Sequence, residues 1–262
     1  MNHTSIVIGA LFAALAVSAC AANAHTVRLA EINIVNRDTG ERLTPYHHGG
    51  RVYVAGTPGQ RYSIELKNRD RGRLLSVLSV DGVNVLTGES AAPAQSGYVL
   101  SPWQQYAITG WRKSADEVAQ FVFTALPDSY AARTGRPDNV GVIGIALFRE
   151  KAAPAPVELS QAPASAPAHE SMADSRAAEE RQEQHGAKRK MRADRLGTGH
   201  GAREVSRTSW TDFERASAAP DELVTIYYDS RQNLIARGVI RVPHNPKPNP
   251  FPAFGFVPDP RG

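Results

Sequence analysis

The stretch LLSVLSVDGVNVL, residues 74–86, decides the fold of this chain. Two runs rich in strand-forming residues, 74–80 and 83–86, are joined by Asp81 and Gly82. An Asp-Gly pair tolerates the positive φ angles of a two-residue hairpin turn, and β-branched side chains pack well on a pleated sheet. The stretch therefore predicts a β-hairpin.

Strand patterns continue on both sides of this hairpin. Residues 62–67 alternate apolar and polar side chains, which is the period of a strand with one face in water. Glycine and proline separate the runs, and few segments have helical spacing. We therefore expect residues 25–150 to form a mainly β domain, an antiparallel β-sandwich or a small barrel. Further strands are expected at 52–55, 97–100, 105–109, 118–124 and 140–148.

Two segments of this domain carry helix signals. Ser114 and Glu117 have the spacing of a helix capping box, but the residues that follow favour a strand, so we expect a short turn that leads into a strand. Residues 128–135 predict a short helix, with Asp128 as its N-cap and Gly135 just beyond its end.

The composition changes abruptly after Lys151. Residues 151–203, rich in Ala, Pro and charged side chains, predict a disordered linker. Residues 204–242 predict a C-terminal β-hairpin, with one strand at 223–228, a turn at 231–233 and a second arm at 234–240. So short a segment cannot bury a core of its own, and we expect it to dock on the sandwich or on an envelope partner protein. Residues 243–262 form a Pro-rich tail.

The N-terminal residues 1–24 have the pattern of a signal peptide. They contain no Lys, Arg, Asp or Glu, and an apolar run too short to span a bilayer is followed by small residues. Cleavage before Cys20, at a lipobox, predicts a lipoprotein anchored through that residue, whereas cleavage after Ala24 leaves His25 as the first mature residue. Either site predicts export, to the periplasm or to the outer membrane as a lipoprotein. Contact with the membrane is expected only through a lipid on Cys20.

The composition and the absence of known motifs exclude several classes of function. Cys20 is the only cysteine, so no intramolecular disulfide can form. The 30 basic and 26 acidic residues are mixed along the chain, which does not favour nucleic-acid binding. The motifs of common hydrolases, nucleotide-binding proteins and zinc enzymes are absent from the sequence. We therefore expect a non-enzymatic protein without a cofactor.

Histidines suggest one metal hypothesis. A mature N-terminal His25 would offer its amine and its imidazole to copper, and His47 or His48 could supply a second imidazole. The alternative is that the His pair lies in an exposed turn beside two glycines.

Four aromatic residues suggest a ligand platform. Tyr98, Trp103, Tyr106 and Trp111 lie close together in the sequence and could bind a carbohydrate or a peptide. The alternative is that they pack in the core or at the rim of the sandwich, where aromatic residues are common.

Residues 61–150 resemble uncharacterised exported proteins of Gram-negative bacteria, above all in VDGVNV at 80–85 and SYAARTG at 129–135. The resemblance implies an envelope location and carries no function or site residues. The sequence thus predicts a non-enzymatic exported envelope protein that serves as a binding or interaction module. A periplasmic copper-binding protein is the alternative.

Overall fold

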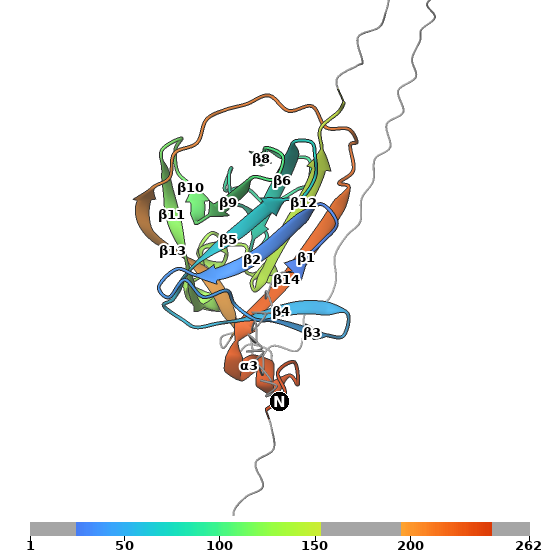
Figure 1. The fold of residues 1–262 in the computed structure, drawn as a ribbon. Helices are drawn as coiled ribbons and strands as arrows, with labels where there is room; N and C mark the ends of the chain where they lie inside the picture. Colours follow the sequence, from blue (N-terminus) through green and yellow to red (C-terminus); the bar gives the residue numbers. More distant parts are fainter. Residues whose placement is uncertain (1–24, 153–194, 243–262) are drawn as a thin grey trace, which may run out of the picture.

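The structure, a computed structural model, describes residues 25–152 and 195–242 (Figure 1). These residues form two seven-stranded sheets that enclose one main core. The prediction of a mainly β fold is confirmed, and the sheets form a sandwich rather than a closed barrel. The predicted signal peptide 1–24, residues 153–194 of the predicted linker, and the predicted tail 243–262 lie outside the described residues.

The first sheet is antiparallel, with the order β1-β2-β5-β11-β10, and with β9 beside β5 and β13 beside β11. Its strands are β1 (His25–Thr26), β2 (Ala30–Asn36), β5 (Arg61–Asn68), β9 (Gln105–Ile108), β10 (Gly110–Arg112), β11 (Glu117–Ala125) and β13 (Leu196–Val205). The alternation predicted for β5 is present in part: Tyr62, Ile64 and Leu66 are buried and Lys67 is exposed, but Ser63 is buried as well.

The second sheet has the order β3-β4-β14-β12-β6-β7, with β8 beside β6. Its strands are β3 (Pro45–His48), β4 (Arg51–Gly56), β6 (Leu74–Val80), β7 (Val83–Asn84), β8 (Tyr98–Leu100), β12 (Val142–Arg149) and β14 (Glu222–Ser230). The predicted hairpin is confirmed, because Val80 pairs with Val83 and the turn residues Asp81 and Gly82 have φ angles of 54° and 73°. One pair departs from the antiparallel prediction, since β14 runs parallel to β4.

Aromatic side chains join the two sheets in the core. The ring of Tyr62 on β5 stacks on Phe123 of β11, with ring centroids 4.2 Å apart, and on Phe121 at 5.3 Å. Tyr228, on β14 of the other sheet, lies 6.5 Å from Tyr62. Burial of each such side chain contributes roughly 1.5–3 kcal/mol to the stability of the fold, so these aromatic residues help to hold the two sheets together.

The two segments with helix signals form short structures. The Ser114 hydroxyl accepts hydrogen bonds from the amides of Asp116 and Glu117 and closes a turn that leads into β11, as expected. The helix expected at 128–135 is shorter than predicted: α1 comprises only Tyr130–Arg133. It lies between the 3-10 turns η1 (Leu126–Asp128) and η2 (Pro137–Asn139). Its N-cap is Ser129, not Asp128, because the Ser129 hydroxyl accepts from the third amide of the helix and Asp128 belongs to η1.

The linker prediction is wrong at its C-terminal end. Residues 196–205 form β13, which pairs with β11 along nearly its whole length. The glycines of this strand allow close packing: a Cβ on Gly197 would lie 2.7 Å from Ser129 Cβ and 2.7 Å from Val140 Cγ1. A Cβ on Gly201 would meet Val122 Cγ2 at 2.7 Å.

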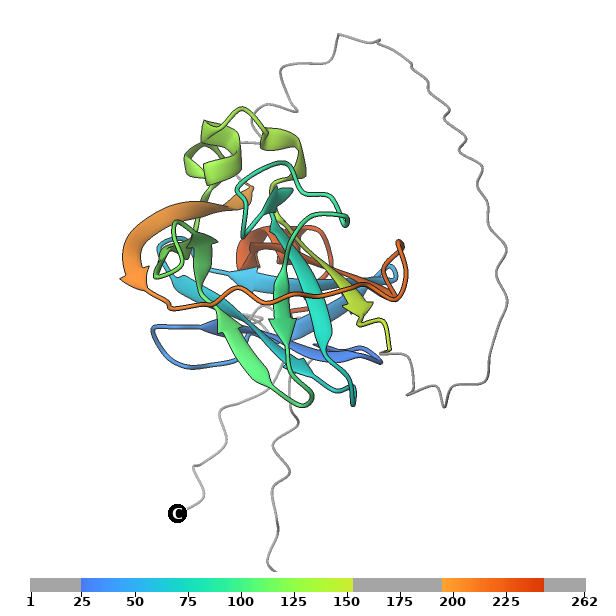
Figure 2. The same cartoon turned by 90° about the horizontal axis from the view of Figure 1, so that it is seen from above.

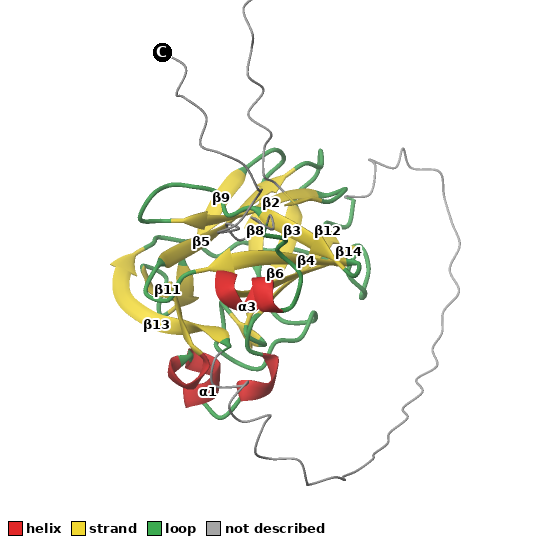
Figure 3. Ribbon diagram, turned by 90° about the horizontal axis from the view of Figure 1, so that it is seen from below, coloured by secondary structure: helices red, strands yellow, loops and turns green. Residues whose placement is uncertain are grey.

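The predicted C-terminal hairpin has only its first arm. β14 is the strand expected at 223–228, but the expected second arm is replaced by the helix α3 (Arg231–Ala236), which is capped by Ser230 (Figure 3). A helix forms here because Leu234 turns toward Tyr53 and packs with Val239 and Ile240 on the outer face of the second sheet. The predicted docking on the sandwich occurs within the chain, where β12 and β4 occupy both edges of β14.

Candidate functional site

The predicted metal ligands lie on separate sheets. His25 begins β1 at the edge of the first sheet, and His47 and His48 lie on β3 at the edge of the second. Within residues 25–152 and 195–242, no group of three or more His, Cys, Asp and Glu side chains is placed to hold a metal ion. Cys20, the predicted lipidation site, lies outside the described residues.

The structure brings together two of the four aromatic residues of the predicted platform. The rings of Tyr98 on β8 and Tyr106 on β9 lie 5.7 Å apart, tilted by 35°. Trp111 is buried instead and meets Phe121 edge-on at 4.9 Å. Trp103 lies in the loop between β8 and β9, with 57% of its surface exposed, and it does not line the pocket described next.

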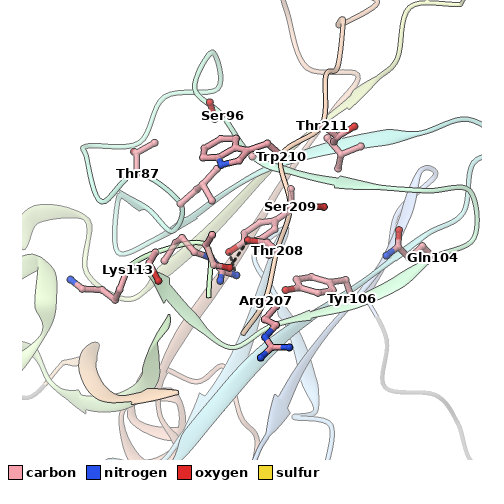
Figure 4. Close-up of a pocket in the computed structure, with 17 residues that line it drawn as sticks. Thr87, Ser96, Gln104, Tyr106, Lys113, Arg207, Thr208, Ser209, Trp210 and Thr211 are labelled. Atoms are coloured by element: carbon pink, nitrogen blue, oxygen red, sulfur yellow. Dashed lines mark hydrogen bonds between the residues drawn. The ribbon is translucent and has the colours of Figure 1, made fainter. Parts of the chain in front are cut away.

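Tyr98 and Tyr106 line a pocket of about 610 Å³ at one end of the sandwich (Figure 4). Its walls come from segments far apart in the sequence: the ends of β8 and β9, the turn that follows β10, the loop after β7, and residues 207–211. Residues 206–211, here called the strap, leave the end of β13 and cross this end of the molecule (Figure 2). The lining residues are Leu86, Thr87, Ser96, Gly97, Tyr98, Val99, Gln104, Tyr106, Arg112, Lys113, Ser114, Ala115, Arg207, Thr208, Ser209, Trp210 and Thr211.

The strap is fixed on both sides of the pocket. On one side the Arg112 guanidinium donates to the carbonyl and the hydroxyl of Ser206, and the Thr208 amide donates to the Ala115 carbonyl at 2.9 Å. On the other side Arg73 donates to the Thr211 hydroxyl at 3.1 Å. Trp210 lies between these attachments with 87% of its surface exposed, and its ring projects from the strap toward Ser96 and Thr87 (Figure 4).

A buried asparagine holds the neighbouring wall. The Asn84 side-chain oxygen accepts hydrogen bonds from the amides of Leu86 and Thr87, at 2.8 and 3.2 Å. Its side-chain nitrogen donates to the Ser96 carbonyl at 3.3 Å. One side chain at the end of the predicted hairpin therefore positions three lining residues.

The pocket lining is positively charged. It contains Arg112, Lys113 and Arg207 and no Asp or Glu. The half-buried Arg112 guanidinium donates its hydrogen bonds to neutral oxygens of Ser206 and Tyr98. Burial raises the pKa of the Tyr98 hydroxyl, so this group stays a neutral donor at physiological pH.

A second polar site lies in the core, beneath the hairpin turn. The fully buried Asp81 carboxylate accepts hydrogen bonds from the amides of Gly141, at 2.9 Å, and Thr198, at 2.8 Å, and from the Tyr228 hydroxyl. Thr198 Oγ1 lies 2.6 Å from the Tyr228 hydroxyl and 2.7 Å from that of Tyr62. Each hydroxyl has one proton, so donation runs from Tyr62 to Thr198, to Tyr228 and finally to Asp81.

Burial raises the pKa of Asp81 to about 6, although its hydrogen bonds act in the opposite direction. Burial also raises the pKa values of Tyr62 and Tyr228 well above the usual range, so both remain neutral donors. No side-chain surface of Asp81 is accessible to a solute, and we therefore assign this network a structural role. It ties β13 and β14 to the hairpin turn.

Sequence reasoning missed most of this geometry. Asp81 was recognised only as a turn residue, which is the commonest role of Asp before Gly. Trp210 and Arg112 meet at the pocket only because the strap crosses between the sheets, and neither belongs to a sequence motif.

Comparison of the chain with protein-family models, with curated proteins and with solved structures finds no match. Among the residues that the structure describes, no helix has the length and apolar character needed to cross a bilayer.

Proposed function

We propose that this protein is an exported, non-enzymatic binding module and that the pocket beneath the strap holds a saccharide. The observation that carries the proposal is the combination, in one pocket, of Tyr98, Tyr106 and Trp210 with many hydroxyl and amide groups. Binding pockets are concave, with aromatic surface and a few polar groups that orient the ligand.

The aromatic and polar groups match the two surfaces of a sugar. The faces of a pyranose ring are lined by C–H groups, which pack on flat aromatic side chains, and its edge carries hydroxyls that need hydrogen-bonding partners. Gln104 and the hydroxyls of Thr87, Ser96, Ser209 and Thr211 surround the aromatic rings and supply donors and acceptors.

Export is proposed from the sequence of residues 1–24, and an envelope protein would meet saccharides there. Intact-mass analysis of the mature protein tests this part. A mature N-terminus at Cys20 or His25 supports export, and an uncleaved chain contradicts it. A free His25 is also what the copper-binding alternative requires, and calorimetry with Cu²⁺ on that form tests the alternative directly.

A glycan array probed with the labelled mature protein tests the ligand class. We expect Trp210→Ala and Tyr106→Ala to weaken binding of the saccharides found by about ten-fold or more, the equivalent of about 1.4 kcal/mol. Trp103→Ala is the matched control, because Trp103 is also exposed but lies outside the pocket. Equal loss in all three variants, or no saccharide binding at all, would contradict the proposal.

A further inference from the structure

We infer that the saccharide bound beneath the strap carries a carboxylate, as a uronic acid or a lactyl-substituted amino sugar does. This inference rests on the proposed function and adds the charge of the ligand. It starts from the pocket lining, which contains three cationic side chains and no acidic one.

The positive charge of the lining is not neutralised by the residues that the structure describes. Salt bridges elsewhere pair Arg37 with Glu204, Arg73 with Glu150, and Arg149 with both Asp70 and Asp221. None of the ion pairs found within 25–152 and 195–242 involves a cation of the pocket.

Acidic residues occur next to lining residues in the sequence, but none of them lines the pocket. Glu117 lies 3.5 Å from Arg203. The hydrogen bond to Glu150 raises the pKa of Arg73, and the negative charge of Asp212 acts in the same direction. Asp116, which follows the lining residue Ala115, is not part of the lining. The cationic side chains of the lining would therefore attract an anionic ligand, and no carboxylate of the lining would repel it.

Arg112 gives the strongest argument. Its guanidinium is half-buried in the pocket wall, holds the strap, and donates its hydrogen bonds to neutral oxygens of Ser206 and Tyr98. A charge withdrawn from water is unfavourable unless an opposite charge compensates it. A carboxylate in the pocket would supply that compensation at short range.

Arg207 is placed to make the direct contact. Its exposed side chain leaves the strap on the side of Tyr106, so a sugar packed on Tyr106 would bring a ring substituent within its reach (Figure 4). A guanidinium binds a carboxylate through paired, charge-assisted hydrogen bonds, which are stronger than those between neutral groups. The Lys113 amine points away from the other labelled side chains and adds positive potential at the rim (Figure 4).

The test uses matched ligands on the full mature protein. Calorimetry compares galacturonic acid oligomers with galactose oligomers, and N-acetylmuramic acid with N-acetylglucosamine. We expect the acid of at least one pair to bind about ten-fold tighter or more, and this advantage to shrink as ionic strength rises. Arg207→Gln should reduce the affinity for the acid more than the affinity for the neutral sugar, because it removes the direct contact and keeps Arg112 and Lys113 in place.

Arg231→Gln is the matched control, because Arg231 is an exposed arginine on α3, outside the pocket. Equal affinity for the acid and the neutral sugar, or an advantage that Arg207→Gln leaves undiminished, would overturn this inference and leave the proposed function standing. Tight binding of sugar phosphates without binding of the carboxylates would also overturn it. Failure of every saccharide would instead remove the proposed function itself.

Discussion

The hydroxyl of Tyr228 donates a hydrogen bond to the carboxylate of Asp81, although 147 positions separate the two residues in the sequence. Asp81 lies in the turn between β6 and β7, and Tyr228 lies on β14, the last described strand in the sequence. The bond therefore connects the N-terminal and C-terminal parts of the fold in the middle of the core.

Tyr228→Phe should destabilise the protein by about 1–3 kcal/mol, because it leaves the buried carboxylate with one donor fewer and Thr198 with one partner fewer. Urea denaturation followed by fluorescence measures the change. The neighbouring Tyr227→Phe is the control, since Tyr227 packs against the outer cluster of Tyr53 and Leu234, whereas Tyr228 belongs to the main core. Equal losses in the two variants would contradict the importance of the Asp81 bond.

The buried carboxyl predicts an unusual pH dependence. Its pKa is raised from 3.8 to about 6 on folding, so the folded state holds the proton more tightly than the unfolded state. The stability associated with Asp81 is therefore fully present below about pH 4 and falls as the pH rises through 6, by roughly 3 kcal/mol in total.

Other carboxyls act in the opposite direction. The pKa values of Asp70 and Glu150 are lowered chiefly by hydrogen bonds from Arg149 and Arg73, so their contributions are lost on acidification. The Asp81 contribution is the difference between the wild-type profile and that of Asp81→Asn. A ¹³C-detected titration of the Asp carboxyls measures the pKa of Asp81 in the intact protein, and we expect its midpoint near 6. A midpoint below 4 for Asp81 would contradict the prediction.

Gly197→Ala should destabilise the protein by about 1–3 kcal/mol, because a methyl group there overlaps Ser129 and Val140 and forces β13 away from α1. Thermal unfolding measures the effect. Gly72→Ala is the control, since a Cβ at Gly72 meets nothing within 4 Å and the residue has no positive φ. If Gly197→Ala is as stable as wild type, the glycine is not required for close packing.

The two described parts of the chain should stay together when the segment between them is cut. Within the described residues, β13 and β14 pair only with strands of residues 25–152. A specific protease site inserted near residue 170 makes the cut, and native mass spectrometry should find both fragments in one complex. Release of the C-terminal fragment would contradict this prediction.

The companion experiment expresses residues 25–152 alone. We expect this fragment not to fold, because β4 and β12 lose the strand that lies between them. A cooperative unfolding transition in the isolated fragment would show that the C-terminal part is not required for folding.

The parts of the fold that depend on local sequence could be predicted. Asp81 and Gly82 form the expected turn, and the apolar residues of β5 face the core as expected, because turn chemistry and strand periodicity act over a few residues. The same local reasoning failed at β13, where the glycines around His200 look like a flexible joint. Their role in close packing depends on Ser129, Val140 and Val122, which are distant in the sequence.

The candidate site was less predictable than the fold. Tyr98 and Tyr106 were singled out because they are aromatic and close in sequence, and both line the pocket. Trp103 and Trp111 have the same local signal, but one is on a surface loop and the other is in the core. Trp210 and Arg207 could not be assigned to the site from the sequence. They lie about a hundred residues after the two tyrosines, and only the path of the strap places them at the same pocket.

The position of β14 has a consequence for how the protein is made. Between β4 and β12 the second sheet has a gap until residues 222–230 have left the ribosome, so most of the chain is synthesised before the sheet can close. Pairings of such long sequence separation also form slowly. If the protein is exported as we propose, this delay would keep the polypeptide competent for translocation, and the last strand would complete the fold on the far side of the membrane.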